Sequence, residues 1–218
     1  MRTLESARFD IKRYEAYVEN SRHLPGLLEE LIAMSDRDEA AHATVGGQEL
    51  ALDPHLASVH REMAEKFATI VANHGWPDRE IAGDEGSRIA WMIVYHLIDQ
   101  PAFERSMFIY LKDVVRNGRI EPWKVAMIED RIRASEGRLQ KYGTRFGWAE
   151  TGQILPEPAI EDPANVDRLR HEVGLSPLAD EIDRRRRAAQ GRSAPSPEAV
   201  ADRKRLFEEL STSVGWRR

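Results

Sequence analysis

The stretch DEGSRIAWMIVYHLI, residues 84–98, decides the fold of this chain. Its apolar residues recur at helical spacing and leave almost no polar face between them. A helix that is apolar nearly all round is buried by its neighbours. We therefore expect a helix from about residue 84 to residue 99 at the centre of the molecule, covered by other helices.

Helical patterns also dominate the rest of the chain, whereas the strand-like alternation of apolar and polar residues is almost absent. The patterns and their terminating Gly and Pro residues predict further helices over about 5–21, 27–45, 53–75, 103–117, 122–136, 162–174 and 197–210. Segments 75–83 and 137–161 are expected to be loops, and the aromatic residues in the second favour an ordered one. The sequence thus predicts an all-α, irregular multi-helix bundle.

Three regions follow from this pattern. Residues 1–24 are expected to form an N-terminal helical extension, and 25–183 the main helical domain. Residues 184–218 combine a basic run, a flexible GRSAPSP linker and a last helix.

Composition narrows the class of protein. The chain has 218 residues, of which 41% are hydrophobic and 32% charged, and it has no cysteine. Disulfides, thiolate zinc sites and a cysteine nucleophile are therefore excluded, and a reducing cytoplasm is the expected location. The charged N-terminus argues against a secretory signal, and no window approaches the roughly 18 apolar residues of a membrane helix.

Charge is distributed unevenly along the chain. Residues 184–218 contain ten Lys and Arg against four Asp and Glu, whereas the remainder contains 22 basic and 33 acidic residues. An acidic body argues against a broad surface for duplex DNA. We expect the basic arm to dock on that body, and only the arm leaves room for a role with nucleic acid.

Metal ligands are weakly indicated. Glu39 and His42 have the E-x-x-H spacing that places two ligands on one helical face, but a carboxylate-bridged di-iron site needs a second such unit. Asp53, His55 and His60 lie nearby, and the two histidines point to different faces. Solvated surface histidines are the favoured interpretation, and a helical metalloenzyme using Glu39 and His42 stays as an alternative. Phosphate-binding glycine loops and a G-x-S-x-G motif are absent.

His96 is the main candidate for proton transfer. It lies on the most apolar helix, where burying an imidazole costs free energy unless the ring is paired. A core histidine bonded to a neighbour is the simpler interpretation from this position alone. Asp130 and Arg131 diverge by about 100° on their helix, so they do not form one exposed pair. Arg131 could hold a carboxylate or phosphate, although a surface charge run explains EDRIR equally well.

Two loops supply further candidates. Trp76 precedes a proline and is held extended, so its ring can wedge against the central helix. In QKYGT, Gly143 can supply a positive φ that lets Tyr142 and Thr144 present their hydroxyls in one direction. The alternative for both segments is a packed loop with satisfied polar groups.

The motifs GWP (75–77), Trp91 to His96, Asp130-Arg131, QKYGT (140–144) and a V-D-x-x-R-x-x-x-G-L-x-P-L pattern over 166–178 occur here in a fixed order. In this, the chain resembles a bacterial family catalogued only as a domain of unknown function, over about residues 50–180. The resemblance implies a shared pocket that includes Arg170, without a known reaction. Two departures are that the chain has Tyr95 before His96, where the family has Gln, and Arg145 after YGT, where the family has Gln.

Together these observations predict a small enzyme for a small polar or anionic substrate. His96 would be the general acid/base, and Asp130 would orient Arg131, the anion anchor. The predicted substrate-binding residues are Trp76, Tyr95, Arg131, Gln140, Tyr142, Thr144, Arg145 and Arg170. The rival hypothesis is a non-catalytic binding or interaction module in which the polar set is a buried network holding the loop. The sequence identifies no cofactor, and it leaves an oligomer open.

Overall fold

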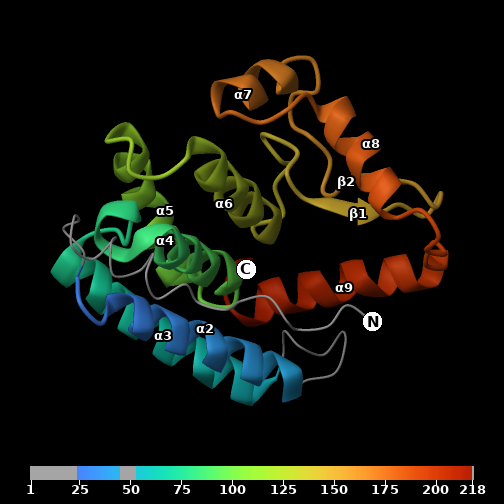
Figure 1. Ribbon diagram of the computed structural model, residues 1–218. Helices are drawn as coiled ribbons and strands as arrows, with labels where there is room; N and C mark the ends of the chain where they lie inside the picture. Colours follow the sequence, from blue (N-terminus) through green and yellow to red (C-terminus); the bar gives the residue numbers. More distant parts are fainter. Residues whose placement is uncertain (1–23, 45–52, 218) are drawn as a thin grey trace.

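The computed structural model describes residues 24–44 and 53–217, and the predicted helix over about 5–21 lies outside these ranges (Figure 1). Within them the chain forms eight helices and one two-stranded sheet, which confirms the predicted all-α class. The helices are α2 (Leu27–Thr44), α3 (Pro54–His74), α4 (Arg79–His96), α5 (Pro101–Arg116), α6 (Pro122–Ser135), α7 (Val166–Glu172), α8 (Leu178–Ala188) and α9 (Pro197–Ser213).

Helix α4 lies between the α2–α3 pair on one side and α5–α6 on the other (Figure 1). Its apolar side chains are buried on several faces, as the all-round apolar pattern predicts, and they include Ile89, Ala90, Ile93 and Val94. The buried faces of α2, α3, α5 and α6 complete the same hydrophobic core. The amphipathic helices therefore gain their stability by covering α4.

Gly86 lies where α2 packs against α4, and its lack of a Cβ atom avoids a clash with Ala82 of its own helix. A Cβ atom at this position would lie 2.7 Å from the Cβ of Ala82 and 3.5 Å from methyl groups of Leu28 and Leu31. The side chains of α2 thus pack directly against the backbone of α4, and this contact positions the polar residues further along both helices.

The start of α4 differs from the prediction, which placed residues 75–83 in a loop. The helix begins at Arg79, because the side chain of Asp78 accepts hydrogen bonds from the amides of Glu80 and Ile81 at 2.9 and 3.2 Å. Gly83, with φ of 75°, interrupts the helix and separates this first turn from the buried segment. A capping aspartate three residues after a glycine stop was the overlooked signal.

The segment 137–161 is ordered and contains the only strands in the described part of the chain. Strands β1 (Phe146–Trp148) and β2 (Ile154–Pro156) pair antiparallel, with Gly147 opposite Leu155, and a parallel bridge joins Gln140 to Ile160. Strands of three residues are too short for an alternating pattern to be visible in the sequence.

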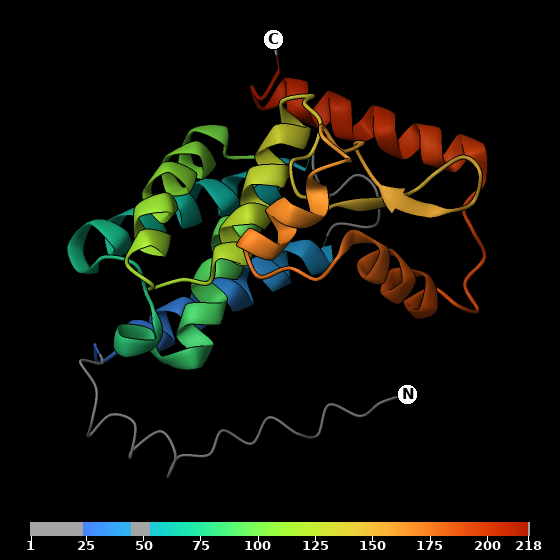
Figure 2. The same cartoon turned by 90° about the horizontal axis from the view of Figure 1, so that it is seen from above.

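The C-terminal part returns to the core. Helix α8 continues through the predicted boundary between residues 183 and 184, and α9 runs from the sheet back to α6 (Figure 2). Beyond α9, the buried indole of Trp216 donates a 2.6 Å hydrogen bond from Nε1 to the carbonyl of Ile98. Trp216 therefore joins the segment after α9 to the residues that follow α4. No helix in the ranges described is both long and apolar enough to cross a membrane.

Candidate functional site

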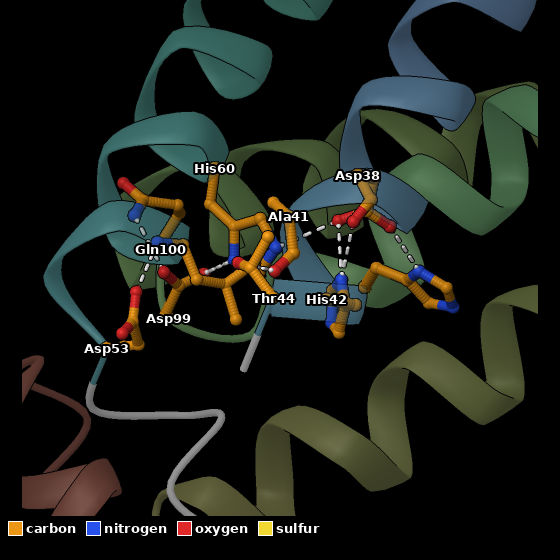
Figure 3. Close-up of polar contacts among 10 residues, drawn as sticks. Asp38, Ala41, His42, Thr44, Asp53, His60, Asp99 and Gln100 are labelled. Atoms are coloured by element: carbon orange, nitrogen blue, oxygen red, sulfur yellow. Dashed lines mark hydrogen bonds and ion pairs between the residues drawn. The ribbon is translucent and has the colours of Figure 1, made fainter. Parts of the chain in front are cut away.

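Three imidazoles from three helices meet at the carboxylate of Asp38. Asp38 and His42 lie one turn apart on α2, and Figure 3 shows both facing His60 from α3. Asp38 Oδ1 lies 3.0 Å from His60 Nε2 and 3.2 Å from His42 Nδ1, while Oδ2 lies 2.8 Å from Nδ1 of His96, the last residue of α4. Each carboxylate oxygen thus has its own histidine contacts.

His60 is held between two carboxylates. Its Nδ1 lies 2.7 Å from Asp99 Oδ1 and its Nε2 faces Asp38, while only 5% of the side chain is exposed. Burial by itself would lower the pKa of His60, but hydrogen bonds with Asp38 and Asp99 outweigh it and raise the pKa to about 9. Burial likewise opposes ionisation of Asp38, yet hydrogen bonds from His60 and His96 hold its pKa well below the usual range. This centre is therefore a charged network inside an apolar bundle.

A cavity of about 310 Å³ opens beside this network. Its polar wall is formed by His42, His60, His96, Asp99 and Arg131, and its apolar wall by Leu56, Ala57, Ile98 and Leu210. The volume lies at the lower end of the range of small-molecule sites, about 300–1,000 Å³. The cavity therefore joins His96 and Arg131, two of the residues singled out from the sequence.

Arg131 reaches this cavity from α6 along a row of aromatic rings. Its guanidinium lies 4.4 Å from the ring centroid of Tyr95, which itself stacks on Trp91 at 5.2 Å. Stacking holds the planar guanidinium in place without using its hydrogen-bond donors. The buried Nε of Arg131 has no hydrogen-bond partner. Tyr95, which was predicted to bind substrate, thus contacts the guanidinium of Arg131 through the face of its ring.

Asp130 points the other way, into the 140–144 loop. Fully buried, it accepts hydrogen bonds from the amides of Lys141, Tyr142 and Thr144 at 2.7 to 3.2 Å, and from the Thr144 hydroxyl at 2.9 Å. No hydrogen bond or ion pair joins it to Arg131. The expected orientation of Arg131 by Asp130 is therefore not what the structure presents: the carboxylate organises the loop.

Two more predicted residues belong to the same loop network. The side-chain amide of Gln140 accepts a hydrogen bond from Arg145 N at 2.7 Å. It also donates to the carbonyl oxygens of Arg145 and Pro158 at 3.0 and 2.6 Å. The buried guanidinium of Arg170 donates to the carbonyls of Tyr142, Gly143 and Ser176. Gly143 has the positive φ expected for it, 63°. No residue of 140–144 lines the cavity at His96.

The remaining predicted residues, Trp76 and Arg145, do not line this cavity either. Trp76 is fully buried and packs edge-on against Phe67, with ring centroids 6.0 Å apart. Arg145 lies over the ring of Phe207 from α9 at 4.7 Å. Burial, followed by the nearby charge of Arg131, lowers its pKa to about 10. Arg145 thus anchors α9, and Trp76 belongs to the core.

The sequence did not single out Asp38 and Asp99, and it treated His60 as a surface residue. Glu39 is exposed, so the partner of His42 is Asp38 at the i,i+4 position on α2. That D-x-x-x-H spacing was the one available signal. The contacts of His60 and Asp99, which are 39 residues apart, depend on the packing of α3 against the end of α4.

Comparison with known proteins gives one match. A family model described as "Family of unknown function (DUF6624)" matches residues 25–192. The comparisons with curated proteins and with solved structures give no match.

Proposed function

The chain belongs to this family of unknown function, and we propose that it is an enzyme acting on a small anionic molecule in the cavity beside Asp38. His96 is the proposed general acid/base, and Arg131 the group that binds the anion. The observation that carries the proposal is that these two side chains, from α4 and α6, line one cavity.

His96 has the arrangement of an oriented acid/base group. Its Nδ1 is held by Asp38 Oδ2 at 2.8 Å, and 38% of the side chain is exposed. An ionised carboxylate accepts from Nδ1–H, so the lone pair of the neutral ring lies on Nε2. In the described part of the chain, Nε2 has no hydrogen-bond partner. A carboxylate that fixes the tautomer of a histidine is a recurring element of acid/base catalysis.

Arg131 supplies the attraction for a negative charge. Arginine forms paired hydrogen bonds to carboxylate and phosphate groups, and its Nε is unpartnered here. Stacking on Tyr95 restricts the guanidinium before any ligand binds, which reduces the entropy lost on binding. The proposal therefore retains His96 and Arg131 from the sequence and assigns no substrate contact to residues 140–144.

Anion binding can be tested with two matched arginines. Arg105 on α5 lies over Trp216 at 4.4 Å, the same distance as Arg131 over Tyr95, but it does not line the cavity. Phosphate, sulfate and small dicarboxylates should raise the melting temperature of the wild type and of Arg105→Gln. Arg131→Gln should lose this response. An equal response of both variants would contradict the proposal.

Turnover needs a separate readout. Chromogenic phosphate and carboxylate esters should be hydrolysed by the wild type, and His96→Gln should lower kcat by about 10²–10⁴-fold. KM should change little, because Arg131 is retained. If the anion binds but neither the wild type nor the variant turns over any such ester, the enzyme proposal fails in favour of a binding role.

A non-catalytic ligand-binding module is the second candidate. This candidate is favoured because Asp130, Gln140 and Arg170 hold the 140–144 loop in place through hydrogen bonds and do not line the cavity. In this case His96→Gln would alter affinity and leave no turnover to lose.

A further inference from the structure

The cluster around Asp38 has a composition that the proposed acid/base role does not require. That role uses Asp38 and His96 only, yet His42, His60 and Asp99 converge on the same point. Charged groups that are buried in an apolar bundle are either paired with one another or coordinate a metal ion.

One nitrogen or oxygen from each of Asp38, His42 and His60 lies within 4.8 Å of the other two. In a tetrahedral site with bonds of about 2.0–2.2 Å, ligand atoms are about 3.3–3.6 Å apart. The contacts of Asp38 Oδ1 with His60 and His42, at 3.0 and 3.2 Å, are slightly shorter. A small expansion of these contacts would make room for an ion.

Asp99 has the position of an outer partner. Metal-binding histidines usually donate their second ring N–H to a carboxylate, which orients the ring toward the ion. Asp99 Oδ1 lies 2.7 Å from His60 Nδ1, and His60 Nε2 is directed at Asp38. Hydrogen-bonding to Asp99 therefore leaves Nε2 as the ligand atom.

We propose that Asp38, His42 and His60 bind one divalent first-row transition-metal ion, with Asp99 orienting His60. Asp38 coordinates through Oδ1 and keeps Oδ2 for His96, so the ion and the acid/base histidine share one carboxylate. His42 has 37% of its side chain exposed, and its ring turns from the carbonyl of Asp38, 2.9 Å away, to complete the site.

Three protein ligands leave a coordination position for water or substrate, which is the pattern of catalytic rather than structural zinc sites. His42 and His60 both line the cavity that contains Arg131, so this position faces the proposed anion site. A catalytic role for the ion rests on the proposed function, whereas the binding of the ion does not depend on it.

The test uses the full chain, freed of metal by a chelator and titrated with Zn²⁺ by calorimetry and with Co²⁺ by visible absorption. We expect one ion per chain and a d–d absorption band that reports the ligand geometry. His42→Gln should weaken binding at least about 10-fold, and Asp99→Asn by about 10–100-fold. His74→Gln, at the exposed end of α3, should bind like the wild type.

His42→Gln is the decisive variant because its side chain is partly exposed, and circular dichroism checks that it folds. Absence of stoichiometric binding to the wild type, or equal affinity of His42→Gln, would overturn the metal site. A loss in His74→Gln as large as in His42→Gln would do the same. Zn²⁺ binding that survives in Arg131→Gln, together with loss of anion binding there, separates this inference from the proposed function.

Discussion

Replacing Glu104 by glutamine should stabilise the protein at alkaline pH and have a much smaller effect at acidic pH. Glu104 lies on α5 with no exposed surface, and neither of its carboxylate oxygens has a hydrogen-bond partner. Burial raises the pKa of this carboxyl from its ordinary 4.5 to about 7, although Arg131 and Arg145 partly oppose the shift.

The sign follows from proton binding. The folded protein retains the Glu104 proton up to about pH 7, whereas the unfolded chain releases it at 4.5, so stability falls as the pH rises between these values and stays low above them. At about 1.4 kcal/mol per pH unit, the full penalty is about 3 kcal/mol. Roughly 2–3 kcal/mol of it develops between about pH 5 and pH 8.

Urea unfolding of the wild type and Glu104→Gln at these two pH values measures this penalty. The stability of the variant relative to the wild type should increase by about 2–3 kcal/mol from pH 5 to pH 8. Other titrating groups are common to both proteins and cancel. Glu104→Leu should show the same increase with a different constant offset. A difference that is independent of pH would refute the reasoning, and a difference of opposite sign would show that Arg131 and Arg145 favour the carboxylate over burial.

Four further substitutions test the framework around the site. Asp130→Asn should cost about 3 kcal/mol of unfolding free energy, because an amide cannot accept every bond that the buried carboxylate accepts; urea unfolding measures the loss, and near-neutral behaviour would contradict the network. Gly118→Ala should cost about 1 kcal/mol of unfolding free energy, because the glycine has a positive φ. Gly143→Ala should cost about 1–3 kcal/mol more, because the new Cβ atom would also lie 2.8 Å from a side-chain carbon. Equal shifts in the melting temperatures of the two variants would argue against a tightly packed loop. Trp216→Ala should cost about 3–5 kcal/mol and increase hydrogen exchange around its partner Ile98, and unchanged exchange would mean that the tail is not anchored there.

Much of the helical architecture could be read from the sequence because it depends on local pattern. The apolar repeat over 84–98 predicted the buried central helix, and Asp53-Pro54 predicted the start of α3, where Asp53 caps the amide of Leu56 at 2.9 Å. The strands β1 and β2 could not be predicted, since three residues carry no readable period.

Only part of the candidate site could be predicted from the sequence. His96 and Arg131 stood out as polar residues at unusual positions, and the structure brings them to one cavity. Asp130, although adjacent to Arg131, faces a different region because successive helical residues diverge by about 100°. The chemistry of the cluster was missed because Asp38 and His60 each look like an ordinary surface residue in a charged helix, and Asp99 looks like part of the corner before Pro101.

The sequence by itself determined most of the helices and the buried position of α4, since helical periodicity and burial follow from the spacing of apolar residues. Only the tertiary structure decided which polar residues meet. Asp38 and His96 are 58 residues apart, and their 2.8 Å contact exists because α2 packs along α4. Likewise, only packing turned the QKYGT segment from the expected wall of a pocket into a loop held by Asp130 and Arg170.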